Sequence, residues 1–167
     1  MPKTIDDLQS AFAGESQANR KYLAFAKAAD AEGKNNLAKL FRAVAEGETV
    51  HALNHFNALD GVKNSAENLK AAIAGETYEI ETMYPGFIGD AQSEGDKRSE
   101  LSFFRANEVE KIHQGLYQEA LEKIATGADI EKKDYYVCSV CGYLAVDRAP
   151  DKCPICGAPK DKFSQIQ

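Results

Sequence analysis

The sequence predicts an all-α four-helix bundle followed by a small, β-rich module that contains cysteines. Helix-favouring residues such as Ala, Leu, Glu and Lys dominate up to about Thr126, and short breaks divide that stretch into four long segments. The part after Thr126 holds all four cysteines, three of the five prolines and short β-prone runs. We therefore expect a bundle over residues 1–130 and a separate module over residues 131–167.

The length and charge of the chain limit the classes of function that it can serve. With 167 residues, it can bury one good hydrophobic core and a small appendage. Its net charge of −6 argues against nucleic acid as the main partner, because phosphate contacts require a basic surface. The N-terminus lacks the features of a signal peptide, and no apolar segment approaches the ~20 residues that span a bilayer. We expect a cytoplasmic protein without nucleic-acid or membrane partners.

The first two helices are predicted from their end signals. The first should begin near Thr4, where Thr4 and Asp7 resemble a capping box, and end near Gly33. The second should run from about Asn36 to Leu59, because its apolar residues recur at helical spacing and an Asp-Gly pair follows.

The next two helices should form a similar pair. Asn64 as a cap, with Glu67 three residues later, predicts the start of a helix that runs towards Ala91. Pro85 should kink or interrupt this helix, because proline lacks the N–H that the helix needs. The fourth helix is expected over about residues 96–126. Four such helices with short connections pack as a bundle.

A short Gly-Glu-Ser/Thr repeat lies in the middle of three of the predicted helices. Its copies are Gly14-Glu15-Ser16, Gly47-Glu48-Thr49 and Gly75-Glu76-Thr77. A glycine within a helix costs roughly 1 kcal/mol relative to alanine, so a glycine before each glutamate needs a reason. Close packing of helices around a crowded site would supply one.

Carboxylates and histidines on the four helices follow a metal-binding pattern. Bundles that hold two irons use one Glu from each of two helices and a Glu-x-x-His pair from each of the other two. The matching residues are Glu15 and Glu76 as single positions, and Glu48–His51 and Glu110–His113 as pairs, with Glu79 as an additional carboxylate. Buried carboxylates without a cation would suffer a large desolvation cost, so the set indicates a metal site.

The individual parts of this pattern are weaker than the whole. A glutamate on a helix is usually solvated, and one Glu-x-x-His pair in a Glu-rich chain is weak evidence. Tyr22 and Tyr84 fall close to the ligand positions, where each fits either a place beside the metals or a place in the core. His55 is expected at the surface, and Glu81 falls off the ligand faces.

The cysteines form two Cys-x-x-Cys knuckles, each followed by a glycine that permits a tight turn of the backbone. They are Cys138, Cys141, Cys153 and Cys156. Four thiolates in tetrahedral geometry suit either Zn²⁺ or a single iron ion. A structural zinc ribbon that holds a small tail together is therefore an alternative to a redox iron site.

Together these motifs resemble the rubrerythrin family over nearly the whole chain. The motif set comprises Glu15 through Tyr22, Glu48-x-x-His51, Glu76-x-x-Glu79, Glu110-x-x-His113 and the two cysteine knuckles. The additional Glu79 and the cysteine tail distinguish the chain from ferritin and bacterioferritin. The resemblance implies a ferritin-like bundle with two irons and a rubredoxin-like domain with one.

The resemblance also implies an activity. A di-iron peroxidase of this kind reduces hydrogen peroxide to water and regains electrons through the four-cysteine iron. The electron donor would be a rubredoxin or a reductase linked to NAD(P)H. The resemblance further implies a homodimer in which the cysteine domain of one subunit approaches the di-iron site of the other.

The resemblance assigns roles to the site residues as well. Glu48 and Glu110 would bridge the irons, Glu15 would bind one iron, and Glu76 with His113 would bind the other. The residues with catalytic roles would be Glu79 and His51, which exchange as ligands, and Tyr22 and Tyr84, which donate hydrogen bonds to ligand carboxylates. Two other functions remain open: a ferroxidase or iron store, and a bundle with a structural zinc tail.

Overall fold

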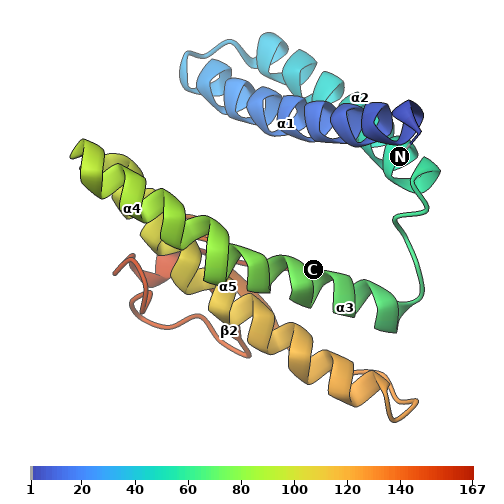
Figure 1. Ribbon diagram of the computed structural model, residues 1–167. Coiled ribbons are helices and arrows are strands. Elements are labelled where there is room, and N and C mark those ends of the chain that lie inside the picture. Colours follow the sequence, from blue (N-terminus) through green and yellow to red (C-terminus); the bar gives the residue numbers. More distant parts are fainter. Residues whose placement is uncertain (1) are drawn as a thin grey trace. The chain divides into compact units, whose positions relative to one another are not determined.

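The computed structural model describes residues 2–167 and divides the chain into two compact units. The first unit ends at Lys63, and the second begins at Asn64. The first is a pair of helices, whereas the second combines a further helical hairpin with the cysteine-containing strands (Figure 1).

The first unit is an antiparallel hairpin of α1 (Lys3–Ala31) and α2 (Asn35–Ala58). The chain turns at Gly33, whose φ of 74° lies in the left-handed region that glycine adopts without strain. Small side chains allow the two helices to approach closely. The buried ones are Ala26, Ala29, Ala38, Ala45 and Ala52. Both predicted helices are confirmed.

The predicted capping box at the start of α1 is wrong. The helix begins at Lys3 with Pro2 as its N-cap, and no side chain caps its first N–H groups. Asp7 instead pairs with Lys3, at 2.8 Å between Oδ1 and Nζ. Lys3 and Asp7 are four residues apart on one helix face, so the Asp7 carboxylate pairs with the Lys3 ammonium group instead of the backbone N–H of Thr4.

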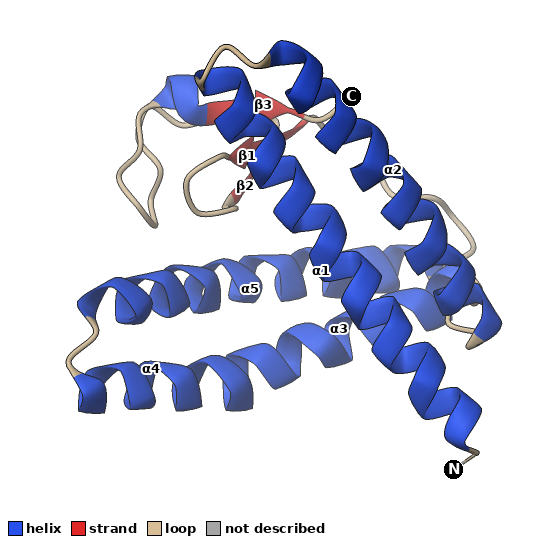
Figure 2. Ribbon diagram, turned by 90° about the horizontal axis from the view of Figure 1, so that it is seen from above, coloured by secondary structure: helices blue, strands red, loops and turns tan. Residues whose placement is uncertain are grey.

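The second unit contains a longer hairpin. Its first arm consists of α3 (Ser65–Tyr78), the π-helical turn η1 (Glu79–Met83) and α4 (Tyr84–Glu94). After a turn at Gly95, α5 (Lys97–Ile124) runs back along this arm (Figure 2). The third and fourth predicted helices are therefore both present, and the π-helical turn divides the third.

The interruption before Pro85 takes the form of the π-helical turn. The backbone N–H of Tyr84 donates to the carbonyl of Glu79, five residues earlier, instead of to the residue four earlier. Pro85 follows at once, within the first turn of α4, where its missing N–H is tolerated. The expected disturbance is thus a widened turn, and the helical arm continues beyond it.

Side chains cap the start of each arm of this hairpin, at Asn64 as predicted and also at Asp96. The Asn64 Oδ1 atom accepts a hydrogen bond from the N–H of Glu67 at 3.0 Å, and the Asn64 amide donates to the Glu67 carboxylate. At the start of α5, Asp96 Oδ1 accepts from the N–H groups of Arg98 and Ser99.

Replacing Asn64 with alanine is expected to destabilise the second unit by about 1 kcal/mol, because the N–H of Glu67 loses its acceptor. Asn64→Ser retains a capping oxygen and should keep most of the stability. Urea unfolding followed by circular dichroism measures both effects. Equal unfolding midpoints for Asn64→Ala and the parent chain would contradict this role of the cap.

The C-terminal module is a small antiparallel sheet with the strand order β2-β1-β3. Its strands are β1 (Tyr135–Cys138), β2 (Leu144–Val146) and β3 (Phe163–Gln165). The register places Val137 opposite Leu144 and Cys138 opposite Phe163. Cys138, Cys153 and Ala158 form its buried core, so the cysteines themselves are the centre of the module.

Both helical hairpins leave apolar side chains exposed. Examples are Phe25, Leu40 and Leu53 in the first unit, and Leu101 and Phe104 in the second. Faces of this kind are covered by other surfaces in bundles. Across residues 2–167, none of the helices is both long and apolar enough to cross a membrane.

Candidate metal centres

The first hairpin brings three predicted ligands together. Donor atoms of Glu15 on α1, and of Glu48 and His51 on α2, all lie within 4.8 Å of one another. His51 Nδ1 is 2.9 Å from Glu48 Oε2, as the three-residue spacing on one helix face allows. The Glu48 side chain is 16% exposed and that of His51 58% exposed. The carboxylates are therefore held between the helices, with the imidazole at the edge.

The second hairpin repeats this arrangement. Donor atoms of Glu76 on α3, and of Glu110 and His113 on α5, also lie within 4.8 Å of one another. His113 Nδ1 is 2.7 Å from Glu110 Oε2 and 4.0 Å from Glu76 Oε1. Each hairpin thus offers one glutamate from one helix and a Glu-x-x-His pair from the other.

The second cluster is electrostatically strained without a cation. Burial, followed by the charge of Glu110 and a hydrogen bond to it, raises the pKa of Glu76 to about 7. Burial and then the charge of Glu110 also raise the pKa of Glu79. Carboxylates that repel one another in a half-buried site are suited to a positive ion, so the donor set fits a metal.

Glu79 lies near this cluster without joining it. The donors within 4.8 Å of one another in the described chain include Glu76, Glu110 and His113, and Glu79 is outside that group. Its charge nevertheless acts on Glu76, and those of Glu110 and His113 act on it. Such a position suits a glutamate that binds the metal in some states of the centre and not in others.

The two tyrosines have different surroundings. Burial, and then the charges of Glu79, Glu110 and Glu76, raise the pKa of Tyr84, so its hydroxyl keeps its proton and lies within the influence of the carboxylates. Tyr22 packs against aromatic rings instead, with centroid distances of 6.2 Å to Phe25 and 6.4 Å to Phe41. Within its own hairpin, Tyr22 thus has the core contacts that the sequence left open.

The glycines of the Gly-Glu-Ser/Thr repeat do not serve close packing inside a hairpin. A Cβ atom added at Gly14, Gly47 or Gly75 would meet no other atom within 4 Å. The crowding expected from the sequence is therefore not the reason for these glycines within either unit. The hydroxyl at the third position of the repeat, in contrast, forms hydrogen bonds in all three copies.

All four cysteine sulfurs gather within 4.8 Å of one another. The Sγ atoms of Cys138 and Cys156 are 3.7 Å apart, and those of Cys141 and Cys153 are 3.5 Å apart. A tetrahedral site with metal–sulfur bonds of about 2.3 Å requires sulfurs about 3.8 Å apart. The cysteines are free thiols, and their spacing fits one tetrahedral metal ion.

Backbone N–H groups of the knuckles point at the sulfurs. Burial alone would raise the pKa of Cys138, but hydrogen bonds from the N–H groups of Val140 and Cys141 lower it overall. Burial raises the pKa of Cys141, which accepts a backbone hydrogen bond from Tyr143. Such N–H donors stabilise thiolates that carry a metal.

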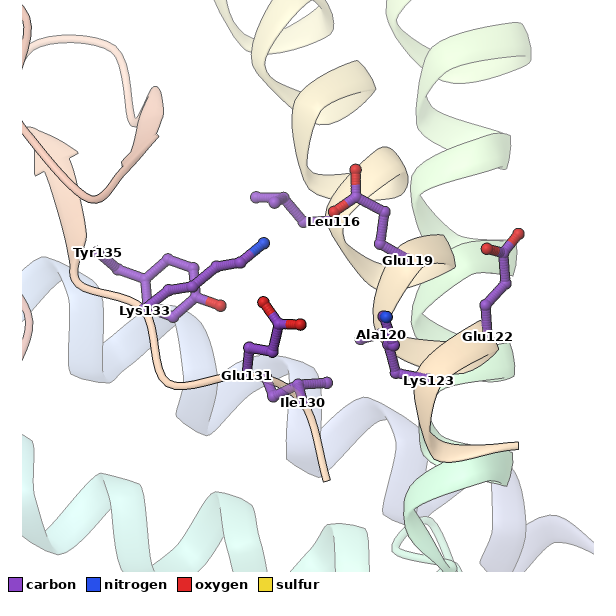
Figure 3. Close-up of a pocket in the computed structure, with 9 residues that line it drawn as sticks. All are labelled: Leu116, Glu119, Ala120, Glu122, Lys123, Ile130, Glu131, Lys133 and Tyr135. Atoms are coloured by element: carbon purple, nitrogen blue, oxygen red, sulfur yellow. The ribbon is translucent and has the colours of Figure 1, made fainter. Parts of the chain in front are cut away.

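One hollow lies apart from the ligand clusters, where the end of α5 faces the segment leading to β1 (Figure 3). It has a volume of about 210 Å³ and is lined by charges of both signs. Glu119 and Lys123 come from the helix, whereas Glu131 and Lys133 come from the connecting segment. This mixed lining contains none of the predicted ligands.

The cysteine module lies against the helix that carries Glu110. A methyl group added at Gly142, next to Cys141, would be 3.9 Å from Val109 Cγ1. Val109 precedes Glu110 in the sequence and is 1% exposed. Cys141 and Val140 also line a groove of about 370 Å³ with Arg98 and other residues of α5. The four-cysteine site therefore approaches α5 within one chain.

Two carboxylate–histidine clusters on helical hairpins and a tetrahedral cysteine site define a di-iron carboxylate protein with a rubredoxin-like module. Comparison with known proteins makes this class more specific. The family model "Rubrerythrin" matches residues 6–121, and "Rubrerythrin, rubredoxin-like domain" matches residues 136–164. The chain belongs to the rubrerythrin family.

Individual relatives agree with this assignment. The chain is 39% identical to rubrerythrin-2 of Clostridium acetobutylicum, over 96% of the chain and 95% of that protein. It is 35% identical to nigerythrin of Nitratidesulfovibrio vulgaris, over 96% of the chain and 85% of that protein. A nigerythrin structure described as fully reduced and all ferrous matches with a TM-score of 0.58 and 33% identity, covering 98% of this chain and 86% of that one.

These findings confirm the family resemblance and the predicted fold class, a mostly helical chain with a small C-terminal antiparallel strand region that bears four cysteines. The ligands of a di-iron site and of a four-cysteine iron site are present, as expected. The roles of the individual ligands stay predictions.

Proposed function

We propose that this chain is a peroxidase that reduces hydrogen peroxide to water. The observation that carries the proposal is the pairing of two matched carboxylate–histidine clusters with a four-cysteine site in one rubrerythrin-family chain. With iron bound, the dinuclear centre supplies the two electrons that, with two protons, convert one hydrogen peroxide into two waters, and the cysteine-bound iron returns electrons singly.

In this proposal the two clusters serve one dinuclear centre. The family resemblance implies Glu48 and Glu110 as the ligands that would be shared by both irons, and each lies between the helices of its own hairpin. Glu15 serves one iron, and Glu76 with His113 serves the other.

The part of the centre that can change its contacts consists of Glu79, His51 and Tyr84. Glu79 stands just outside the compact cluster, and His51 is the most exposed member of the first one, so either can move without disturbing the other ligands. Tyr84 keeps its phenolic proton and can donate a hydrogen bond to a neighbouring carboxylate. We assign Tyr22 a supporting place beside Glu15, on the strength of the resemblance alone.

The electron route is proposed to run along the contact between the cysteine module and α5. Gly142 follows Cys141, and Val109 precedes Glu110, so the sequence neighbours of a sulfur ligand and of a carboxylate ligand face each other at this contact. This route uses one chain, whereas the family resemblance implies a route between the subunits of a homodimer. A rubredoxin or an NAD(P)H-dependent reductase would supply the electrons.

Two further parts of the proposal concern the whole chain. Paired Cys-x-x-Cys units that hold a metal are typical of a reducing compartment, which supports a cytoplasmic location. A domain boundary near residue 130 stays a prediction, and limited proteolysis that cuts the chain there would support it.

The experiment that tests this function combines metal analysis with turnover. Anaerobically loaded protein should contain about three irons per chain and, after oxidation, show the red colour of a ferric four-thiolate site. With reduced rubredoxin as donor, it should consume hydrogen peroxide faster than dioxygen. Faster consumption of dioxygen would favour a ferroxidase, and a colourless, zinc-containing module would favour a structural tail.

A matched variant separates the two metal sites. Cys156→Ser disturbs the four-cysteine site but leaves every carboxylate ligand in place. The reduced variant should consume one peroxide per di-iron centre and then stop, because electrons no longer return. Sustained turnover at the parental rate would show that the cysteine site is not the relay.

A further inference from the structure

Each hairpin contains a hydrogen bond between its two helices, directly beside the ligand glutamates. In the first, the Asn19 amide on α1 donates to Thr49 Oγ1 on α2 at 2.8 Å and to the carbonyl of Ala45 at 2.7 Å. In the second, the Gln114 amide on α5 donates to Thr77 Oγ1 on α3 at 2.7 Å. All of these bonds are partly buried.

The two bonds are built to the same plan. Asn19 lies four residues after the ligand Glu15, and Gln114 lies four residues after the ligand Glu110. Each amide reaches the hydroxyl of the residue that directly follows the ligand glutamate on the opposite helix, Thr49 after Glu48 and Thr77 after Glu76. One helical turn and one residue therefore connect each bond to both ligand glutamates of its hairpin.

The threonine hydroxyls are oriented to accept these bonds. Thr77 Oγ1 donates its own proton to the carbonyl of Ile73 at 2.7 Å, and Thr49 Oγ1 donates to that of Ala45 at 3.2 Å. With its proton directed along its own helix, each oxygen presents a lone pair to the amide of the opposite helix. The bond is thus fixed in direction as well as in distance.

We propose that the Asn19–Thr49 and Gln114–Thr77 bonds are interhelical clamps that hold the ligand glutamates at metal-binding distance before the metal arrives. Without metal, the repulsion between Glu76 and Glu110, where both are charged, tends to separate α3 from α5 at the ligand level. The clamp opposes that separation one turn away. These are positioning residues, and they give a role to the third position in two of the three copies of the Gly-Glu-Ser/Thr repeat.

The remaining copy of the repeat provides a matched control. Ser16 follows Glu15 and donates to the carbonyl of Phe12 at 2.7 Å, the same bond within a helix that the two threonines make. Its recorded side-chain hydrogen bond stays within α1, whereas the threonines also accept an amide from the facing helix. Ser16→Ala therefore removes the hydroxyl without removing a clamp.

The test is an anaerobic titration of Fe²⁺ into the full-length chain with zinc in its four-cysteine site. Thr77→Val keeps the size of the side chain and removes the hydroxyl, so it should weaken ferrous binding about tenfold. Thr77→Ser restores the hydroxyl and should return the affinity to within about twofold of the parent. Ser16→Ala should bind as the parent does.

Two further measurements complete the test. Circular dichroism of each metal-free variant shows whether it folds. Titration of Fe²⁺ into a double variant, Gln114→Leu with Thr77→Val, shows whether the two residues act through one bond. Because both changes break one bond, the double variant should lose no more affinity than either single variant. The clamp would be overturned if Thr77→Val bound Fe²⁺ with the affinity of the parent. It would also be overturned if Thr77→Ser or Ser16→Ala lost as much affinity as Thr77→Val. A Thr77→Val chain that does not fold, beside a folded Thr77→Ser chain of weak affinity, would also overturn it.

The inference rests on the proposed metal centre, but its failure is distinguishable from that of the centre. If the parent chain binds no Fe²⁺ at the carboxylate clusters, the proposed function fails. If the parent binds two ferrous ions and the variants match it, only the clamp fails.

Discussion

Replacing Glu79 with alanine is expected to lower peroxide turnover by on the order of a hundredfold while two irons still bind. Glu79 stands outside the compact cluster of Glu76, Glu110 and His113, so its loss leaves those donors in place. Its raised pKa, caused by burial and then by the charge of Glu110, shows that it is nonetheless close to them. A ligand that enters only in one oxidation state should affect the reaction more than metal retention.

Iron analysis and steady-state turnover on the same preparation check this prediction. Glu81→Ala is the matched control, because Glu81 is an exposed glutamate in the same π-helical turn. Turnover of Glu79→Ala at the rate of the Glu81→Ala control would remove the special role of Glu79. Loss of iron from Glu79→Ala would make it a permanent ligand instead.

The second large effect concerns Glu76 in the metal-free chain. The pKa of Glu76 is raised from 4.5 to about 7 by burial and by Glu110, so the folded chain holds a proton there that the unfolded chain releases more easily. The stability that this proton contributes is fully present below pH 4.5 and is lost as the pH rises through 7. Glu76→Gln removes this loss, because glutamine has no charge to bury.

Metal-free Glu76→Gln should therefore melt a few degrees above the parent at pH 8 and close to it at pH 5, while binding iron poorly at both. Thermal melts in a chelating buffer, followed by iron titration, measure the two effects. Glu119→Gln, on an exposed position of α5, is the control. A difference between Glu76→Gln and the parent that is as large at pH 5 as at pH 8 would show that ionisation of the buried Glu76 carboxyl is not the cause.

The ligand clusters could be predicted from the sequence because helical spacing alone determines them. Glu48 and His51, three residues apart, must share a face wherever a helix forms, and the structure places their donor atoms 2.9 Å apart. Their meeting with Glu15 required only that short connections produce antiparallel hairpins. The cysteine site was equally predictable, since two knuckles with this spacing bind one metal.

Other features depend on contacts that local patterns do not encode. The π-helical turn at Glu79 was seen only as a disturbance at Pro85, because an i to i+5 bond leaves no composition signal of its own. The capping box predicted at Thr4 does not form, because the carboxylate of Asp7 pairs with Lys3 instead. Asn19 and Gln114 were missed, although their shared position four residues after a ligand glutamate was a usable signal.

The hydrogen bond from Tyr84 to the carbonyl of Glu79 has a consequence for any shortened or lengthened version of this chain. In a uniform α-helix, residues five apart point about 140° away from each other around the axis. The wide turn brings residue 84 back above residue 79, so the helix carries one residue more than regular winding needs. Deleting one residue between them would restore regular winding and leave the later side chains of α4 near their present direction relative to Glu79, because four residues of α-helix advance about 400°. The same deletion elsewhere in α4 would rotate every later side chain by about 100°. Natural insertions and deletions in this arm are therefore constrained by winding rather than by length.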